Sequence, residues 1–381
     1  MPIVLKWLGW FLMALAFAGC AYQLLSAVLL RRLLRPGAVV RTDPGPGITV
    51  LKPLHGDEPG LRDALESLLS QAYPGPLQVV FGVQSPSDPA QTVVAALQRA
   101  FPDRDIAMVV DPTPHGANRK VANLINMRAS ARYEVLVLAD SDIAAPPGYL
   151  TGLAAALEPP EIGVVTCPYR GRAAAGGWSR LAAMGLSYQF LPSVAAGVGL
   201  GMARPCMGST IALRAETLDR IGGFEAFADV LADDYAIGAA VRKTGLQSVV
   251  APILVAHNSV EASLEEVVRH ELRWARTVRG VDPGGFAGSI VTYPAPLALI
   301  AVLLTGADNL ALAALAAALI SRLWVWREVD RLAGASTGPW WQSPLRDSLS
   351  FAVFVGSFFV RAVDWRGDRF RVDGQGALRR I

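Results

Sequence analysis

Two aspartates separated by one serine, Asp140-Ser141-Asp142, directly follow the short apolar run Val135–Ala139. The run is unbroken and partly β-branched, which predicts a strand buried on both faces of a parallel sheet. Carboxylates at the carboxyl end of such a strand enter the crevice where open α/β sheets bind ligands. Two carboxylates one residue apart can hold a hard divalent cation, and that cation can hold a diphosphate. The pattern indicates an enzyme that uses a nucleotide diphosphate.

A second acidic pair, Asp233-Asp234, opens an expected helix after a glycine-rich turn. Acids at a helix start are stabilised by the helix dipole, so a capping pair is one interpretation. The other makes one of them a general base, which an alcohol acceptor requires because a neutral hydroxyl is a poor nucleophile. The small-residue loop 206–210, with Gly208 and Ser209, is open to two interpretations as well: a surface against a sugar, or a plain turn.

A basic helix is expected around His270, Arg273 and Trp274. One interpretation is a solvated basic face. In the other, Arg273 neutralises a leaving diphosphate and Trp274 packs beside the acceptor or the sugar.

The elements that must position these residues alternate between strand and helix. Apolar runs at 48–54, 77–83 and 106–110 are typical of strands, and a helix is expected at 58–71 and another from Pro89. This alternation predicts a parallel sheet with a nucleotide site at its carboxyl edge. Polar residues stand where the strands end: Asp57, Gln84, Asp88 and Asp111.

Asp88 serves equally well as a helix N-cap. The segment 116–124 joins the sheet to the next helix, and its Lys120, Asn118 and Asn123 side chains can reach diphosphate or sugar oxygens.

Apolar segments at both ends indicate a membrane protein. Residues 7–30 carry no charge and are long enough to span a bilayer, and Arg31, Arg32 and Arg35 follow. Positive charge after the span predicts an uncleaved anchor with its N-terminus outside and a cytoplasmic catalytic domain. Segments 289–305 and 310–325 are expected to form a transmembrane hairpin.

Two further apolar segments are ambiguous. Residues 349–363 contain Arg361 and either span or lie in the interface, and 181–203 are expected to face the membrane as an interfacial helix or loop rather than to span it. The net charge of only +3 argues against a nucleic-acid partner. The cysteines Cys20, Cys167 and Cys206 have neither zinc-site nor disulfide-framework spacing.

The order of these motifs resembles the ceramide glucosyltransferase family, membrane enzymes with a GT-A (Rossmann-like, mostly parallel) catalytic domain. The resemblance covers essentially the whole chain, and no single motif is specific by itself. It is carried by 51–57, 82–84, 88–90, 118–124, Asp140-Ser141-Asp142, 233–235 and Arg273-Trp274.

The family pattern is D, D, D, (Q/R)xxRW. The resemblance implies that Asp57 lies in the nucleotide pocket, that Asp140 and Asp142 bind Mg²⁺ or Mn²⁺, and that Asp234 is the catalytic base. The fourth motif reads His270-x-x-Arg273-Trp274, so His270 departs from the pattern. The nucleotide-sugar site would take in Asp57, Gln84, Asp88, Asn118, Lys120, Asn123, Asp140, Arg273 and Trp274, and Gly208, Ser209, Asp233 and His270 would line the acceptor side or its loops.

The implied organisation is an anchor at 1–35, a GT-A domain at 36–285 and a C-terminal membrane region at 286–381. The implied reaction moves glucose from UDP-glucose to the primary hydroxyl of a membrane lipid, ceramide, with inversion. The bacterial enzymes of hopanoid glycolipid synthesis share these motifs, so transfer of N-acetylglucosamine from its UDP derivative to a bacteriohopanepolyol is an alternative.

Three other function classes fit the sequence less well. A polyprenyl-phosphate sugar synthase stays open as a further alternative, although its phosphate acceptor needs no base. A processive polysaccharide synthase needs more spans than three or four, and a transporter places its charges within the spans. The expected location is the bacterial inner membrane.

Overall fold

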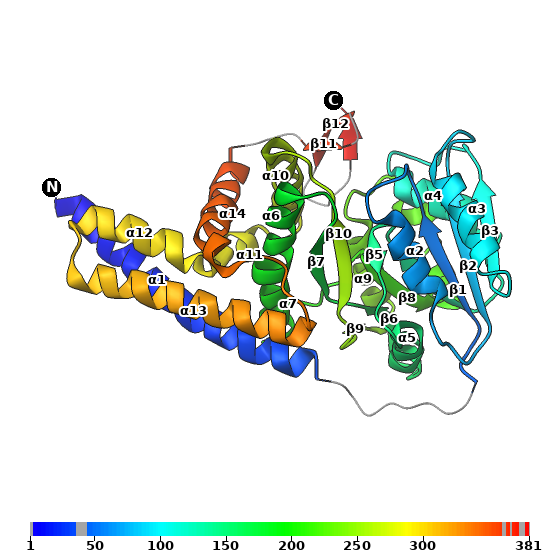
Figure 1. Ribbon diagram of the computed structural model, residues 1–381, viewed down its shortest axis with the longest axis horizontal. Coiled ribbons are helices and arrows are strands. Elements are labelled where there is room, and N and C mark those ends of the chain that lie inside the picture. Colours follow the sequence, from blue (N-terminus) through cyan, green and yellow to red (C-terminus); the bar gives the residue numbers. More distant parts are fainter. Residues whose placement is uncertain (1–2, 36–43, 360–362, 366–367, 373–377, 381) are drawn as a thin grey trace. The chain divides into compact units, whose positions relative to one another are not determined.

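The computed structural model describes residues 3–35, 44–359, 363–365, 368–372 and 378–380 (Figure 1). The chain divides into two compact units. The sheet unit comprises Arg35–Arg170 and Ala203–Val260; the helical unit comprises Met1–Leu34, Gly171–Met202 and Glu261–Ile381. Residues 171–202 and 261–285, which were expected in the catalytic domain, therefore pack within the helical unit.

A seven-stranded sheet organises the sheet unit, in the order β3-β2-β1-β4-β8-β6-β9. The first four strands are parallel, and β8 runs antiparallel to both of its neighbours. The bounds are β1 (Ile48–Pro53), β2 (Leu77–Val83), β3 (Asp105–Val110), β4 (Val135–Ala139), β6 (Ile162–Thr166), β8 (Thr210–Arg214) and β9 (Gln247–Val250). The mostly parallel sheet expected from the sequence is confirmed.

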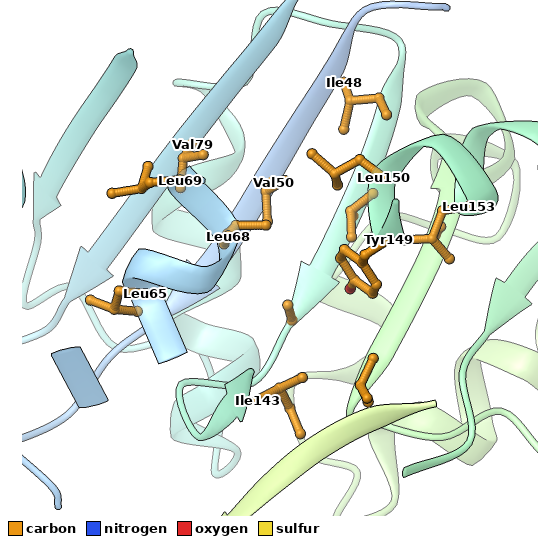
Figure 2. Close-up of a cluster of buried hydrophobic side chains, with 14 of the residues drawn as sticks. Ile48, Val50, Leu65, Leu68, Leu69, Val79, Ile143, Tyr149, Leu150 and Leu153 are labelled. Atoms are coloured by element: carbon orange, nitrogen blue, oxygen red, sulfur yellow. The ribbon is translucent and has the colours of Figure 1, made fainter. Parts of the chain in front are cut away.

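Helices cover both faces of this sheet. On one face α2 (Leu61–Leu69), α3 (Ala90–Ala100) and α5 (Tyr149–Leu157) close a core. Figure 2 shows Leu68 of α2 beside Val50 of β1 in this core. On the other face lie α4 (Arg119–Arg128), α8 (Ala215–Arg220), η2 (Glu225–Phe227) and α9 (Asp233–Lys243).

Strand β4 is buried on both faces, as its apolar run predicted. Val135, Val137 and Ala139 belong to the first core, whereas Leu136 and Leu138 belong to the second. Each fully buried Val or Leu contributes about 1.5–3 kcal/mol, so this strand is anchored from both sides. A smaller sheet has the order β5-β10-β7, with β5 (Ile143–Ala144), β10 (Val255–Ser259) and β7 (Tyr169–Ala173).

In the helical unit, α1 (Ile3–Leu33) packs along α12 (Pro294–Thr305) and α13 (Asn309–Ala333), as Figure 1 shows. Seven of the ten buried residues of α1 recur every three or four positions, which is the spacing of one helix face: Gly9, Met13, Ala16, Cys20, Gln23, Ala27 and Leu30. Small residues let the helices approach closely. A Cβ on Gly9 would lie 2.8 Å from the Thr305 Cγ2 methyl group.

Within the described residues, three helical runs are long and apolar enough to cross a membrane: Ile3–Leu33, Gly177–Gly199 and Asn309–Ala333. The second is built from α6 (Gly177–Gly185), the π-helix η1 (Leu186–Phe190) and α7 (Leu191–Gly199). The segment 181–203 thus has the length and composition of a span.

The first arm of the expected hairpin is not a straight helix. The arm consists of η3 (Ser289–Thr292), which continues the preceding α11 (Pro283–Gly288), and of α12, and the chain bends by 68° where η3 meets α12. Pro294 begins α12 and has no backbone N–H to continue a helix from η3, which explains the break. The other segments of this unit are α10 (Leu264–Val281), η4 (Trp340–Gln342), α14 (Ser343–Ser357), β11 (Val363–Trp365), β12 (Asp368–Val372) and β13 (Leu378–Arg380). Residues 360–362 of the ambiguous stretch 349–363, including Arg361, lie outside the described residues.

A buried ion pair joins α13 to α14. Arg322 Nε lies 2.7 Å from Asp347 Oδ2, and both side chains are 5% exposed. The same guanidinium donates to the Tyr188 carbonyl oxygen and to Gln189 Oε1 in the π-helix, at 2.7 and 2.8 Å. The charge on Arg322 is therefore fully compensated, as a buried ionic group among apolar helices requires.

Candidate active site

The strand register brings the motif-bearing strand ends to one edge of the sheet. Leu51 of β1 pairs with Val80 of β2 and with Leu138 of β4. Because all three strands are parallel, the residues that follow them emerge side by side. The turns after β1, β2 and β4 therefore meet at this edge.

Asp140-Ser141-Asp142 forms the body of a β-turn. The Ile143 amide donates to the Asp140 carbonyl oxygen at 3.2 Å, the hydrogen bond that closes such a turn. Beyond it, β5 pairs antiparallel with β10, and the Asn258 amide donates to the Asp142 carbonyl oxygen at 2.9 Å. Both ends of the turn are thus fixed by backbone hydrogen bonds, and neither of these bonds uses a side-chain carboxylate.

Lys120, in the first turn of α4, connects the two acidic motifs. Its Nζ lies 2.6 Å from Asp140 Oδ1 and 3.6 Å from Asp233 Oδ2. Asn118 is completely buried and caps α4, because its side-chain oxygen accepts from the Lys120 and Val121 amides. The Asn118 amide group donates to the Val230 carbonyl oxygen at 2.8 Å and to Asp233 Oδ1 at 3.3 Å.

Asp234 lies at the centre of the site. Its Oδ2 accepts from the Gly208 amide at 2.8 Å and its Oδ1 from the Tyr235 amide at 2.7 Å. A Cβ built on Gly208 would lie 3.2 Å from Asp234 Oδ2, 3.4 Å from Lys120 Nζ and 3.5 Å from Asp140 Oδ2. Three segments far apart in the sequence therefore converge around this glycine.

Burial and the neighbouring charges shift the pKa values of Asp234 and Lys120. Burial, and then the charge of Asp233, raises the pKa of Asp234 to about 6. Burial would lower the pKa of Lys120, but the carboxylates of Asp140 and Asp233 raise it above its ordinary value. Asp234 can therefore take up a proton near neutral pH, whereas Lys120 stays charged.

The other expected donor-site residues have structural contacts. Asp88 is buried and accepts from the Gly56 amide at 2.9 Å and from the Ala90 amide at 3.0 Å, so its carboxylate ties the turn after β1 to the first residue of α3. Asn123 donates to the Gly82 carbonyl oxygen at 2.8 Å.

Three more of the expected residues differ in exposure. Ser209 is buried and donates to the Cys167 carbonyl oxygen at 3.2 Å. Asp57, in the turn after β1, is exposed, and Gln84, directly after β2, is half-buried.

Two residues at the acidic turn were not singled out from the sequence. His257 of β10 lies with Nε2 3.2 Å from Asp142 Oδ2, and its ring stacks on Tyr169. Lys52 of β1 is 1% exposed and donates from Nζ to two carbonyl oxygens of the turn. The sequence does contain a signal for Lys52, because a lysine inside an apolar strand is unusual. No local pattern in the sequence marks His257.

The acidic turn suits a divalent cation that also binds a diphosphate. Among the described residues, no three His, Cys, Asp or Glu side chains group to hold an ion, and Asp142 Oδ1 is buried without a hydrogen-bond partner. Burial would raise the pKa of Asp142, but His257 and Lys52 lower it, so this carboxylate is ionised. Mg²⁺ is usually bound by one or two carboxylates together with the phosphates of the substrate.

The fourth motif lies on α10 in the helical unit. His270 Nδ1 is 2.6 Å from Glu261 Oε1, and the His270 ring meets the Trp274 ring edge-on at 4.5 Å between centroids. His270, which departs from the family pattern, thus supports Trp274. Arg273 and Trp274 are both half-buried.

The chain is similar in sequence to known glycosyltransferases. The family model described as glycosyl transferase family 21 matches residues 11–378. Ceramide glucosyltransferase 1 of Caenorhabditis elegans is 26% identical over 241 residues, which are 62% of this chain and 51% of that protein. An N-acetylglucosaminyltransferase of Rhizobium meliloti is 25% identical over 268 residues, 68% of this chain and 62% of its own. The chain spans about half the length of the first curated relatives it matches.

The fold has a counterpart among solved structures. A mannosyltransferase from Pyrobaculum calidifontis, solved with GDP-Man and Mn²⁺, aligns over 93% of this chain and 99% of its own, with a TM-score of 0.53 and 21% identity. This likeness concerns the fold, which is of the GT-A type with apolar helices added. Since the family model covers almost the entire sequence, the chain belongs to glycosyl transferase family 21.

Proposed function

We propose that this protein transfers glucose from UDP-glucose to the primary hydroxyl of a membrane lipid, ceramide, and inverts the anomeric centre. The observation that carries the proposal is the convergence of Lys120, Asp140 and Asp234 around Gly208. This arrangement combines a base with groups that suit a cation and a diphosphate. The ceramide glucosyltransferases among its relatives favour this donor and acceptor.

Asp234 takes the proton from the acceptor hydroxyl as the hydroxyl oxygen attacks the anomeric carbon. The bond between that carbon and the β-phosphate oxygen breaks, its electron pair leaves with UDP, and one displacement converts an α-linked donor into a β-glycoside. The pKa of about 6 suits this base, because Asp234 is mostly ionised at neutral pH yet basic enough to accept a proton.

The turn at Asp140-Ser141-Asp142 would hold Mg²⁺ or Mn²⁺ through Asp142, with Asp140 and His257 beside it. A bound cation supplies positive charge that stabilises the departing diphosphate. The charge of Lys120 offsets part of the negative charge of Asp140 and Asp233, which reduces the repulsion that a diphosphate would meet in the donor pocket. Asp57, Gln84 and Asp88 shape the nucleotide end, and Asn118 and Asn123 hold α4 in place.

Arg273 and Trp274 complete the proposal as partners of the leaving diphosphate and the acceptor, the roles that the family pattern implies. The acceptor reaches the protein from the bilayer, and the catalytic motifs face the cytoplasm, where UDP-sugars are made. Arg31 and Arg32 at the end of α1 support this orientation.

A second candidate is transfer of N-acetylglucosamine to a bacteriohopanepolyol. It is favoured by the Rhizobium meliloti N-acetylglucosaminyltransferase, which aligns over a larger share of this chain than the Caenorhabditis elegans relative does.

The test is a substrate matrix on the purified full-length protein. Each of UDP-glucose, UDP-N-acetylglucosamine and GDP-mannose is combined with ceramide, a hopanoid polyol and a polyprenyl phosphate, and the products are identified by mass spectrometry and NMR. We expect a β-glucosyl ceramide. A hopanoid product would establish the second candidate, and a polyprenyl product or an α-linkage would refute the base-assisted inversion.

A further inference from the structure

Lys52 occupies a position where the alternation of inward and outward side chains along β1 predicts a buried apolar residue. Ile48 and Val50 of β1 face the core under α2, as Figure 2 shows, and Lys52 is the next residue of that alternation. It is 1% exposed. A buried lysine destabilises a core unless its charge and its donors are matched, so its presence here needs an explanation beyond packing.

The partners of Lys52 are the two ends of the acidic turn. Nζ donates to the Asp140 carbonyl oxygen at 2.8 Å and to the Ile143 carbonyl oxygen at 3.0 Å. These belong to the first and fourth residues of the β-turn that carries Ser141 and Asp142. One ammonium group therefore clamps the turn from the inside of the sheet, while the Asn258 amide binds the Asp142 carbonyl oxygen from β10.

These hydrogen bonds fix the backbone from which the two carboxylates extend. With the carbonyl oxygens of the turn directed to Lys52 and Asn258, Asp142 Oδ1 keeps no hydrogen bond within the described part of the chain. Hydrogen bonds to the groups that carry metal ligands fix ligand orientation, and their loss typically lowers metal affinity about 10–100-fold. A turn without the clamp would sample other conformations.

We propose that Lys52 is a positioning residue that sets the Asp140–Ile143 turn so that Asp142 meets a divalent cation and the donor diphosphate. The inference rests on the proposed function, because the cation and the diphosphate belong to it. Lys52 donates to backbone carbonyl oxygens of the turn, so it would act on the cation and the diphosphate through the turn. Its effect should therefore appear in the affinity for the cation–nucleotide pair, a quantity separate from catalytic turnover.

The experiment measures Mn²⁺-dependent UDP binding to the detergent-purified full-length protein by calorimetry, together with the melting temperature. Lys52→Met keeps the length and packing of the side chain but removes both donors. We expect its Kd for UDP in the presence of Mn²⁺ to rise by about 10–100-fold. Lys52→Arg, which retains charge and donors in a different geometry, should recover part of that loss.

Thr49→Val is the matched control. Thr49 lies on the same strand, is completely buried, and its hydroxyl binds Gln78 Oε1 and the Arg132 and Tyr133 amides at the opposite end of β1. This variant also loses buried hydrogen bonds, but far along the strand from the turn. We expect it to melt at a lower temperature and to bind UDP with Mn²⁺ like the parent.

The inference fails if Lys52→Met binds UDP with Mn²⁺ within twofold of the parent, or no more weakly than Thr49→Val. If Lys52→Met does not fold, Lys52→Arg decides in its place: an affinity equal to that of Thr49→Val overturns the positioning role. A parent protein that binds UDP equally well in EDTA would instead refute the cation in the proposed function, so the two failures are separable.

Discussion

Replacing Asp234 with asparagine tests whether Asp234 acts as the general base or has only a structural role. Asparagine keeps one side-chain oxygen for the Gly208 or Tyr235 amide, which lie 2.8 and 2.7 Å from the carboxylate oxygens. The stability lost with one such hydrogen bond is at most about 1.5–3 kcal/mol. Relief of the repulsion between Asp234 and Asp233 offsets part of that loss.

The rate should change far more. Removal of a general base costs typically 10²–10⁴-fold, which is about 3–5 kcal/mol of barrier. We therefore expect Asp234→Asn to lose nearly all sugar transfer while its affinity for UDP and its melting temperature stay close to those of the parent. Initial rates by mass spectrometry, calorimetry with UDP and thermal unfolding are the three measurements.

The pH profile adds a second signature. Because burial and Asp233 raise the pKa of Asp234 to about 6, the parent rate should fall tenfold per unit as the pH drops below about 6. Asp233→Asn is the matched control: it removes the neighbouring negative charge, which lowers the pKa of Asp234, so the acid limb should move to lower pH with much of the activity retained. Transfer by Asp234→Asn within tenfold of the parent, or an inactive Asp233→Asn with a normal Asp234→Asn, would refute the assignment.

Three further predictions follow from the same geometry. EDTA should abolish transfer, Mn²⁺ or Mg²⁺ should restore it, and Asp142→Ala should be inactive with an unchanged melting temperature; full turnover in chelator would reduce the acidic turn to a structural feature. Gly208→Ala places a methyl group 3.2–3.5 Å from Asp234, Lys120 and Asp140, so donor affinity and rate should fall at least about tenfold while the fold persists, as circular dichroism would show. A cysteine at exposed Ser87 should resist an impermeant reagent in intact cells and react after lysis, since the three native cysteines are buried; labelling from outside would overturn the cytoplasmic orientation.

Much of the architecture was predictable because it depends on local patterns. The uncharged run at 7–30 forms the middle of α1, and the apolar runs at 77–83 and 135–139 are β2 and β4 with the same bounds. Apolar composition and periodicity determine which segments leave water, and this requires no knowledge of the rest of the chain. The strand end that carries Asp140-Ser141-Asp142 was identified for the same reason.

Tertiary structure decided the rest. An apolar strand pattern specifies neither direction nor neighbours, so the antiparallel β8 between β4 and β6 could not be predicted. Nor could the pattern show that the side-chain oxygen of Asn118 caps α4 while its NH₂ group donates to Val230 and Asp233. The position of His257, which lies on β10 beside Asp142, was equally hidden.

The candidate site shows the same division. The sequence by itself determined which acids stand at element ends, because helix and strand boundaries have local signals. Only folding brings Lys120 between Asp140 and Asp233, raises the pKa of Asp234 through burial, and buries Lys52 beneath the acidic turn. These properties depend on distances between residues that are remote in the chain, and such distances are set by the packing of the whole sheet rather than by any short stretch of sequence.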